Sequence, residues 1–395
     1  MIDQSGDERL PGERLIAVLT TGRQDWGILR STCLAIRATA GLRLRLLVGG
    51  MHLSAAHGST VDLLRADRFE PDATLAWIDD AAMPAHGQVA AALALVGAEL
   101  TAHRPDALVL AGDRFETAAA ALAATLAGVP IVHIHGGEQT EGAFDDALRH
   151  AITKLSRLHL VSEPEHARRV IALGEDPSTV HVVGAPGLDN ALRDDLPDRA
   201  ALAADLGLAL EPPVVIVTVH PETLGTEAHA LTAAITAAMD AVPATYVVTL
   251  PNSDPDADRI RAQLVAAVDA NPRRIAVEAL GERRFWGLLR IADAMLGNSS
   301  SAIIEAPIVG LPAVNVGDRQ RGRHRAANVI DSAADGAAVT EALRLALAPA
   351  TRAAIAAAGL PLADGRAGER IARIIAGWIP PDPPRKAPLK VPDEP

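Results

Sequence analysis

Short apolar runs that alternate with helical stretches constrain this 395-residue chain more than any other feature of its sequence. Most runs end in a glycine or a polar turn, and a stretch with helical periodicity follows. Strands that alternate with helices in this way form parallel sheets covered by helices on both faces. We therefore predict an α/β protein. The predicted strands are residues 15–20, 42–48, 106–111, 130–134, 158–161, 180–183, 213–219, 245–250, 274–277, 294–296 and 313–316.

A turn-rich segment divides these strands into two sets. The GAPG sequence at 184–187 is typical of a turn, and we place a hinge between two domains at 184–198. A chain of this length also suggests about two domains. The predicted parts are a flexible extension at 1–14, domains at 15–190 and 198–362, a last helical segment at 363–379, and a proline-rich disordered tail at 380–395.

The composition narrows the class of partner. A formal net charge of -12 argues against nucleic acid or an anionic membrane as the general partner. A single cysteine, Cys33, excludes an internal disulfide. We find no signal-peptide pattern at the start of the sequence and no apolar run that approaches the roughly 18 residues of a membrane span. We expect a cytoplasmic protein of the size of an enzyme, and an anionic small molecule can still bind where local arginines and helix N-termini supply positive potential.

The richest group of polar side chains follows the predicted strand 130–134. The sequence IVHIHGGEQTEGAFDDALRHAITKL, residues 131–155, places Glu138, Glu141, Asp145 and Asp146 directly after this strand. Ligands bind outside the carboxyl ends of strands in open α/β sheets, so we predict the floor of an active site here. Arg149 lies four residues after Asp145 and can share a helix face with it. The alternative is a capped helix with one surface ion pair, and Glu141 is the carboxylate we expect to be solvated.

Three other strand ends in the first half carry candidate ligand contacts. Arg23 follows the strand 15–20, and His52 follows a glycine pair after the strand 42–48. Asp113 and Arg114 follow the strand 106–111, where an acid, a base and a helix start meet. Each has a structural alternative: Arg23 as a solvated loop residue, His52 as a buried structural histidine, and Asp113 as a helix N-cap.

The second half carries an anion-binding signal. The GNSSS sequence at 297–301 joins a short strand to a predicted helix through Glu305, so main-chain N–H groups and hydroxyls converge where a helix dipole is positive. Arg319, at the next strand end, is a natural diphosphate partner. His220 and Asn252 each follow another predicted strand. The alternative for the serines is a simple helix cap.

Longer motifs connect these positions to a known family. HIHGGEQTEGAFDDALRHAITKLSRLH, GEDPSTVHVVGAPGLD, and GNSSSAIIEAP followed by GLPAVNVGDRQRGR resemble the hydrolysing UDP-N-acetylglucosamine 2-epimerases of sialic-acid-type sugar biosynthesis. The shorter motifs TGRQDWGILR, GGMHLS, AGDRFE, TVHPETL and LPNSD extend the resemblance over most of residues 15–331, in family order.

The resemblance implies a fold and a reaction. The fold is of the GT-B type, with two doubly wound Rossmann-like domains facing a central cleft and a last helix that crosses back to the first domain. In the reaction, UDP-N-acetylglucosamine loses its C2 proton and its UDP to give a 2-acetamidoglycal, and water adds to give N-acetylmannosamine. The resemblance implies no redox cofactor, no metal, and a homodimer or homotetramer.

The resemblance also carries residue roles onto this sequence. The positions that match the catalytic group are Asp113, Glu138, Asp145 and His220. Those that match nucleotide contacts are Arg23, Arg114, His220, Asn252, Ser299, Ser300, Glu305 and Arg319. Expected sugar contacts are His52, Asp146 and Arg149. Which carboxylate is the base and which the acid stays open.

Four alternative functions share part of this pattern. An enzyme that acts on a UDP-diacetamido-trideoxyhexose, in a legionaminic-type pathway, would share all the motifs. A non-hydrolysing 2-epimerase would yield only the epimeric UDP-sugar. A GT-B glycosyltransferase would share the fold and the nucleotide site but would not need this set of carboxylates. An inactive nucleotide-sugar sensor would bind UDP without turnover.

Overall fold

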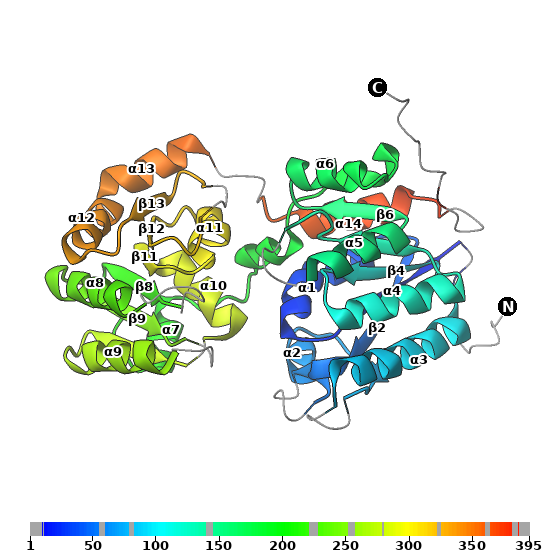
Figure 1. Ribbon diagram of the computed structural model, residues 1–395, viewed down its shortest axis with the longest axis horizontal. Coiled ribbons are helices and arrows are strands. Elements are labelled where there is room, and N and C mark those ends of the chain that lie inside the picture. Colours follow the sequence, from blue (N-terminus) through cyan, green and yellow to red (C-terminus); the bar gives the residue numbers. More distant parts are fainter. Residues whose placement is uncertain are drawn as a thin grey trace. The chain divides into compact units, whose positions relative to one another are not determined.

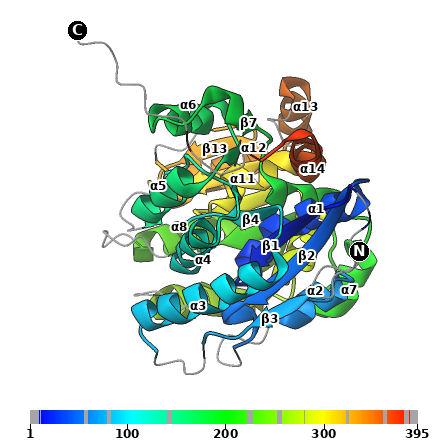
Figure 2. The same ribbon diagram turned by 90° about the vertical axis from the view of Figure 1, so that its right-hand side faces the viewer.

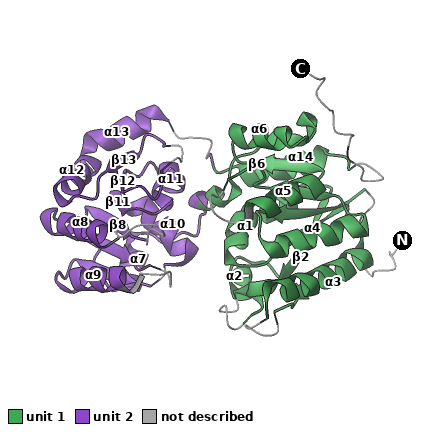
Figure 3. Ribbon diagram, in the orientation of Figure 1, with its two compact units in different colours: residues 1–190, 365–395 green, residues 191–364 purple. Residues whose placement is uncertain are grey.

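Two compact units make up the protein, and each is built on its own parallel β-sheet (Figures 1 and 3). In this computed structural model the first unit comprises Met1–Asn190 and Gly365–Pro395, and the second comprises Ala191–Asp364. The structure describes residues 10, 12–54, 60–78, 83–139, 145–220, 228–251, 257–278, 280–321, 325–359, 364–380 and 386, with only the main chain of Asp145, Ala228, Ala257 and Asp258. The predicted α/β class with two doubly wound sheets is confirmed.

The first sheet places three strand ends with candidate residues side by side. In spatial order its described strands are β3 (Ala73–Leu75), β2 (Leu42–Gly49), β1 (Arg14–Thr20), β4 (Ala107–Ala111), β5 (Ile131–Ile134), β6 (Leu158–Val161) and β7 (Val180–Val182). Every described pair is parallel. Ala111 pairs with Ile134, and Ile134 with Leu160, so β4, β5 and β6 end at the same edge of the sheet.

Helices bury both faces of this sheet, which is why its strands are mostly apolar. Its helices are α1 (Arg23–Ala38), α2 (Val61–Ala66), α3 (Ala85–His103), α4 (Phe115–Ala127), α5 (Asp145–Leu155), α6 (Pro164–Ala172) and α14 (Ala367–Gly377). Ile16 and Val18 of β1 face α1 and α14, while Ala17 and Leu19 face α3 and α4. Figure 2 shows α3 and α4 side by side along one face.

Helix α14 belongs to the first unit although it follows the whole second unit in the chain. It packs on α1, and the Asp189 carboxylate accepts hydrogen bonds from the main-chain nitrogens of Ala367 (3.1 Å) and Gly368 (2.7 Å). The first N–H groups of a helix have no partner within it, so Asp189 satisfies two of them from a distance.

The second sheet has the strand order of a Rossmann-like unit. In spatial order its described strands are β10 (Arg274–Val277), β9 (Thr245–Thr249), β8 (Val214–Thr218), β11 (Ala294–Gly297), β12 (Ala313–Val316) and β13 (Val329–Ser332). The helices and short 3₁₀ turn η5 are α7 (Arg199–Leu206), α8 (Ala228–Ala241), α9 (Ala257–Asp269), α10 (Gly281–Ile291), α11 (Ser301–Ile304), η5 (Ala306–Val309), α12 (Gly336–Leu347) and α13 (Pro349–Ala358). The chain order reverses between β8 and β11, the point at which such sheets bind ligands.

Several predicted boundaries are wrong. No strand was predicted between residues 48 and 106, but this part of the chain contains α2 and β3; the strand β13 was not predicted either. Both strands are short edge strands of three or four residues. The helix expected to run through Glu305 ends at Ile304. In the described part of the chain, we find no helix with both the length and the apolar character to cross a bilayer.

Candidate active-site groups

The carboxyl edge of β4, β5 and β6 gathers several ionisable side chains of the first unit. Asp113 follows β4, His135 and Glu138 follow β5, and Ser162 follows β6. Main-chain bonds from Gly112 to Ile134 (3.0 Å) and from His135 to Leu160 (3.2 Å) hold the three strand ends in register. Neighbouring parallel strands therefore place these side chains at one edge of the sheet; of the four, Asp113 and Glu138 are candidates from the sequence.

Arg149 of α5 joins two of the predicted residues. Its guanidinium forms an ion pair with Asp113 and donates a hydrogen bond of 3.0 Å to Asp146. Arg149 is only 5% exposed, so the alternative of a surface ion pair is wrong. The N-cap of α4 is Arg114, so the alternative of Asp113 as an N-cap is also wrong. Charge-assisted hydrogen bonds of this kind fix the geometry of both partners.

A second cluster is centred on Glu138. Its carboxylate lies 2.5 Å from Nδ1 of His135 and accepts a hydrogen bond of 2.8 Å from the Ser162 hydroxyl. That hydroxyl has one proton and gives it to Glu138, so Nδ1 of His166, 2.9 Å away, donates to the Ser162 oxygen. The Glu138 carboxylate therefore has an imidazole on one side and a hydrogen-bonded Ser162–His166 pair on the other.

Burial and charge act in opposite directions on this cluster. Burial by itself lowers the pKa of His135, but the charge and hydrogen bond of Glu138 outweigh it and raise the pKa. Burial opposes ionisation of Glu138, yet the charge of His135 and the hydrogen bonds from His135 and Ser162 lower its pKa to about 2. The ionised carboxylate and a protonated imidazole stabilise each other. Such a pair can accept or deliver a proton.

The main chain after β5 is strained where it presents these side chains. His135 has φ of 65°, in the left-handed region that non-glycine residues seldom occupy. Gly137 follows with φ of 76°, and a Cβ there would lie 2.3 Å from the main-chain oxygen of His166. In the described structure, Nε2 of His135 is buried and has no hydrogen-bond partner.

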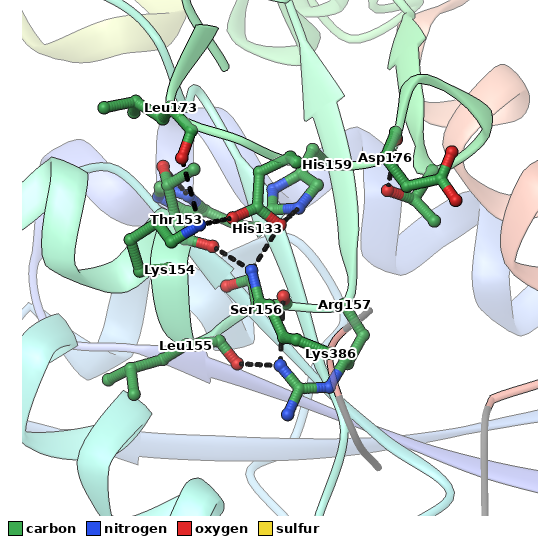
Figure 4. A network of polar contacts seen from close by, with 12 residues as sticks. His133, Thr153, Lys154, Leu155, Ser156, Arg157, His159, Leu173, Asp176 and Lys386 are labelled. Atoms are coloured by element: carbon green, nitrogen blue, oxygen red, sulfur yellow. Dashed lines mark hydrogen bonds and ion pairs between the residues drawn. The ribbon is translucent and has the colours of Figure 1, made fainter. Parts of the chain in front are cut away.

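A buried polar network supports α5 from the other end (Figure 4). The Glu175 carboxylate contacts His159 (3.0 Å), Lys154 (2.7 Å) and Lys386. Lys386 also donates to the main-chain oxygen of Thr153 in the last turn of α5 (3.1 Å). Cations are favoured near the last carbonyl groups of a helix, so these contacts stabilise the helix that carries Arg149.

The loops after β1 and β4 hold the predicted arginines. Arg114 forms an ion pair of 2.8 Å with the buried Glu116. Arg23 is the exposed first residue of α1. Asp25 does not cap α1, whose N-cap is Gly22; it accepts a hydrogen bond of 3.0 Å from the main-chain nitrogen of Thr21 and one from the Thr21 hydroxyl. Asp25 thus fixes the turn that presents Arg23.

His52 is wholly buried, and both of its ring nitrogens have protein partners. Nε2 lies 2.9 Å from the Thr20 hydroxyl and Nδ1 lies 2.8 Å from the Thr60 hydroxyl. Burial lowers the pKa of His52 to about 4, so the ring is neutral near pH 7. These contacts favour the structural alternative for His52, and the structure does not bring its ring nitrogens to the Glu138 cluster.

In the second unit, the ends of β8 and β11 are tied together at His220. The Asn298 side chain accepts a hydrogen bond of 2.8 Å from the main-chain nitrogen of His220 and donates one of 2.9 Å to its oxygen. Gly297 makes this approach possible: it has φ of 141°, and a Cβ there would lie 1.9 Å from the main-chain oxygen of Thr218.

The serine turn differs from the expected anion site. Helix α11 is a single turn of four residues, so its dipole is small. The turn still offers main-chain donors, because in the described structure the N–H groups of Ser299 and Ser300 have no hydrogen-bond acceptor. Arg319, which is exposed, donates to the main-chain oxygen of Asn298 (3.2 Å) and so lies beside this turn. Glu305 is half-buried between α11 and η5.

Some predicted residues lie outside the described part of the chain. They are Glu141, Asn252 and the side chain of Asp145. Conversely, no role was predicted from the sequence for His135, Ser162, His166 or Asn298. Their contacts depend on main-chain geometry and on strand neighbours that no local motif reveals. Among the described residues, we find no group of three or more His, Cys, Asp or Glu side chains placed to hold a metal ion.

Comparison with known sequences gives a consistent result. The sequence profile of the family described as UDP-N-acetylglucosamine 2-epimerase matches residues 34–376. The chain is 35% identical over 344 residues to the UDP-N,N'-diacetylbacillosamine 2-epimerase (hydrolyzing) of Legionella pneumophila, covering 85% of this chain and 89% of that protein. It is 32% identical over 337 residues to the Polysialic acid biosynthesis protein P7 of Escherichia coli, covering 84% and 85%.

Solved structures share the fold at lower sequence identity. A putative UDP-N-acetylglucosamine 2-epimerase from Listeria monocytogenes superposes with a TM-score of 0.79 at 18% identity, covering 92% of this chain and 96% of that chain. The UDP-GlcNAc 2-epimerase from Neisseria meningitidis bound to UDP-GlcNAc has a TM-score of 0.75 at 16% identity, covering 92% and 100%. These similarities show a common GT-B-like fold.

Proposed function

The chain belongs to the UDP-N-acetylglucosamine 2-epimerase family, and we propose that it is a hydrolysing enzyme that converts UDP-N-acetylglucosamine to N-acetylmannosamine and UDP. The C2 proton is removed, UDP leaves to give a 2-acetamidoglycal, and water adds at C1 while a proton returns to C2. The proposed proton-transfer group is Asp113, Glu138, Asp145 and His220, and a larger set of residues holds the nucleotide.

The Glu138 cluster is the observation that carries this proposal. Abstraction of a weakly acidic C2 proton needs a positioned carboxylate, and the return of a proton needs a donor. Glu138 is ionised and hydrogen-bonded to His135, whose raised pKa favours the protonated ring. The Glu138–His135 pair therefore contains both a proton acceptor and a proton donor. Asp113 and Asp145 remain the further proposed carboxylates of the reaction.

Arg149 has a separate part in the proposal. It is a buried cation that is held in place by Asp113 and Asp146, and it stands beside the proposed proton-transfer groups. A fixed positive charge at this position stabilises negative charge that develops as the C2 proton leaves. Asp146 and Arg149 thus serve as sugar contacts.

The nucleotide contacts are proposed for residues that lie at loop and strand ends of both units. In the second unit, the main-chain donors of Ser299 and Ser300 and the Arg319 guanidinium suit a diphosphate. Glu305 is assigned to the ribose hydroxyls, and His220 and Asn252 complete this group. In the first unit, Arg23 and Arg114 supply further positive charge.

A UDP-diacetamido-trideoxyhexose is the second candidate substrate. It is supported by the name of the Legionella pneumophila relative, a UDP-N,N'-diacetylbacillosamine 2-epimerase (hydrolyzing) that is 35% identical to this chain. The reacting C1 and C2 positions are the same in both sugars, so the Glu138 cluster suits either. The two substrates differ at C4 and C6, and the contacts there decide the preference.

Product analysis in D2O tests the proposal. The protein is incubated with each UDP-sugar, and products are identified by NMR. We expect free UDP and the free 2-epimeric sugar with deuterium at C2. UDP-N-acetylmannosamine as sole product would indicate a non-hydrolysing enzyme. Transfer of the sugar without deuterium at C2 would indicate a glycosyltransferase, and UDP binding without turnover would indicate a sensor.

A matched pair of variants tests the role of Arg149. Arg149→Lys keeps the positive charge but cannot bridge two carboxylates. Loss of a hydrogen bond between charged groups costs about 3 kcal/mol, so we expect kcat/KM to fall about 100-fold. Arg45→Lys alters a comparably shielded ion pair, with Glu99 at 2.7 Å, and is expected to leave kcat/KM unchanged. Equal effects of the two variants would remove Arg149 from the mechanism.

A further inference from the structure

Asn298 occupies an unusual position for a polar residue. It directly follows β11, its side chain has no exposed surface, and both ends of its amide are used by one partner. Its oxygen accepts from the main-chain nitrogen of His220 (2.8 Å), and its nitrogen donates to the main-chain oxygen of His220 (2.9 Å). A paired donor and acceptor fix both the distance and the orientation of the peptide chain.

The main chain of Asn298 also binds the next strand end. Its carbonyl oxygen accepts hydrogen bonds from Nε2 of Gln320 (2.9 Å) and from Arg319 (3.2 Å). Gln320 is only 2% exposed, so the first of these bonds is buried. The main-chain nitrogen of Asn298 donates to the main-chain oxygen of Thr218 (3.2 Å). One residue therefore connects the ends of β8, β11 and β12.

We propose that Asn298 is a positioning residue that aligns His220 and Arg319 for binding of the UDP diphosphate. This inference rests on the proposed function, because it assigns Asn298 to the nucleotide part of that site. Asn298 does not itself need to touch the ligand. It acts through the main chain at His220 and through its own carbonyl group at Arg319.

Asparagine suits this role better than the residues nearest to it in size. Aspartate can accept from the His220 nitrogen, but it can donate to the His220 oxygen only when its carboxyl is protonated. Serine is too short to span both groups, and alanine removes the partners of two main-chain groups that are partly shielded from solvent. The chemistry of the side chain therefore gives a test that depends on pH as well as on size.

Three variants separate positioning from general stability. Asn298→Ala removes both side-chain hydrogen bonds to the main chain of His220. Asn298→Asp keeps the hydrogen bond from the His220 nitrogen and regains the one to the His220 oxygen when its carboxyl group is protonated. The control is Tyr246→Phe, which removes a buried hydrogen bond of 2.7 Å to the main-chain oxygen of Val242 in the same unit. Circular dichroism confirms that each variant is folded. UDP affinity is measured by calorimetry, and turnover as UDP release from the UDP-sugar.

The expected result is specific to the site. Asn298→Ala should weaken UDP binding and lower kcat/KM by about 30-fold, while Tyr246→Phe changes neither. Hydrogen exchange at the His220 amide should accelerate in Asn298→Ala and not in the control. Asn298→Asp should recover UDP affinity as the pH is lowered towards about 6, because burial favours its protonated form. Asn298→Ala should show no such recovery.

Different failures have different meanings. If the wild type turns over UDP-N-acetylglucosamine and Asn298→Ala binds UDP equally well, the positioning role is overturned and the proposed function stands. If the wild type has no turnover but Asn298→Ala weakens UDP binding, the positioning role stands and the proposed function fails. If the wild type does not bind UDP, both are overturned.

Discussion

Replacing Glu175 by glutamine should destabilise the first unit. The Glu175 side chain is 4% exposed and is the shared anionic partner of Lys154, His159 and Lys386. Glutamine keeps the size of the side chain but loses the negative charge. The variant therefore leaves two lysines beside a neutral group under the last turn of α5 (Figure 4).

The pKa of Glu175 gives the magnitude. Burial opposes its ionisation, but the hydrogen bonds from His159, Lys154 and Lys386 lower the pKa from 4.5 to about 2. At about 1.4 kcal/mol for each pH unit, this corresponds to about 3 kcal/mol. The two lysines are 37% and 24% exposed, so solvent screening reduces the effect. We expect Glu175→Gln to lose about 2 kcal/mol of unfolding free energy near pH 7.

The dependence on pH follows from the sign of the shift. A pKa that is lowered on folding adds stability above the ordinary value of 4.5, and this contribution is lost as the pH falls towards 2. Burial lowers the pKa of Lys386 to about 8, and the hydrogen bond and negative charge of Glu175 partly offset this effect by stabilising the ammonium ion. The difference between wild type and Glu175→Gln should therefore shrink between about pH 4 and pH 2.

Urea unfolding and hydrogen exchange measure this loss. Exchange of peptides that cover α5 and β6 reports on the first unit alone, which avoids mixing the unfolding of two units. The matched control is Glu165→Gln, which removes a surface ion pair to Arg169 and should cost less than about 0.5 kcal/mol. The double variant with Lys386→Gln should lose less than the sum of the two single variants.

Two results would refute this reasoning. A loss below about 0.5 kcal/mol near pH 7 would mean that the Glu175 network contributes no more than a surface pair. If the variant loses the same unfolding free energy at low pH and at neutral pH, the loss comes from packing and not from charge.

Two further predictions concern the candidate site. Glu138→Gln should lower the thermal unfolding temperature most between pH 4.5 and 6.5, where Glu138 is ionised and His135 is protonated. Because the pKa of His135 is raised in the folded protein, the difference in unfolding temperature between wild type and variant should decline as the pH rises above that pKa. A difference in unfolding temperature that does not vary with pH would contradict the ion pair. Gly297→Ala should give insoluble or strongly destabilised protein, because its Cβ would lie 1.9 Å from the Thr218 oxygen, whereas Gly377→Ala, with open space around it, should leave solubility and unfolding temperature near those of the wild type.

Most of the fold was predictable because it depends on repeated local patterns. Strands buried on both faces need apolar residues throughout, and each is followed by a turn and a helix. Two of the four edge strands are the exception: β3 and β13 have few residues and were not predicted, although the edge strands β7 and β10 were. Helix α14 shows the opposite limit, since its amphipathic pattern predicts a helix but the family resemblance alone implied which unit it joins.

The candidate site was predictable where residue types follow strand ends directly. Asp113, Glu138 and the pair Asp146–Arg149 lie at one edge of the sheet because parallel neighbours end together. The role of His135 was not predictable, since its ring reaches Glu138 only through a left-handed main-chain conformation. The nucleotide and catalytic assignments remain proposals that the variants above test.

The sequence by itself determined the α/β class, the two sets of strands and the positions where polar residues leave the sheet. Those properties follow from apolar periodicity and turn residues, which act over a few neighbouring positions. Only the tertiary structure decided which of those polar residues meet. Asn298 contacts His220, which is 78 positions away in the sequence, and Arg149 contacts Asp113, which is 36 positions away. Contacts of this range depend on strand order and on close approach at glycines, which no short stretch of sequence encodes.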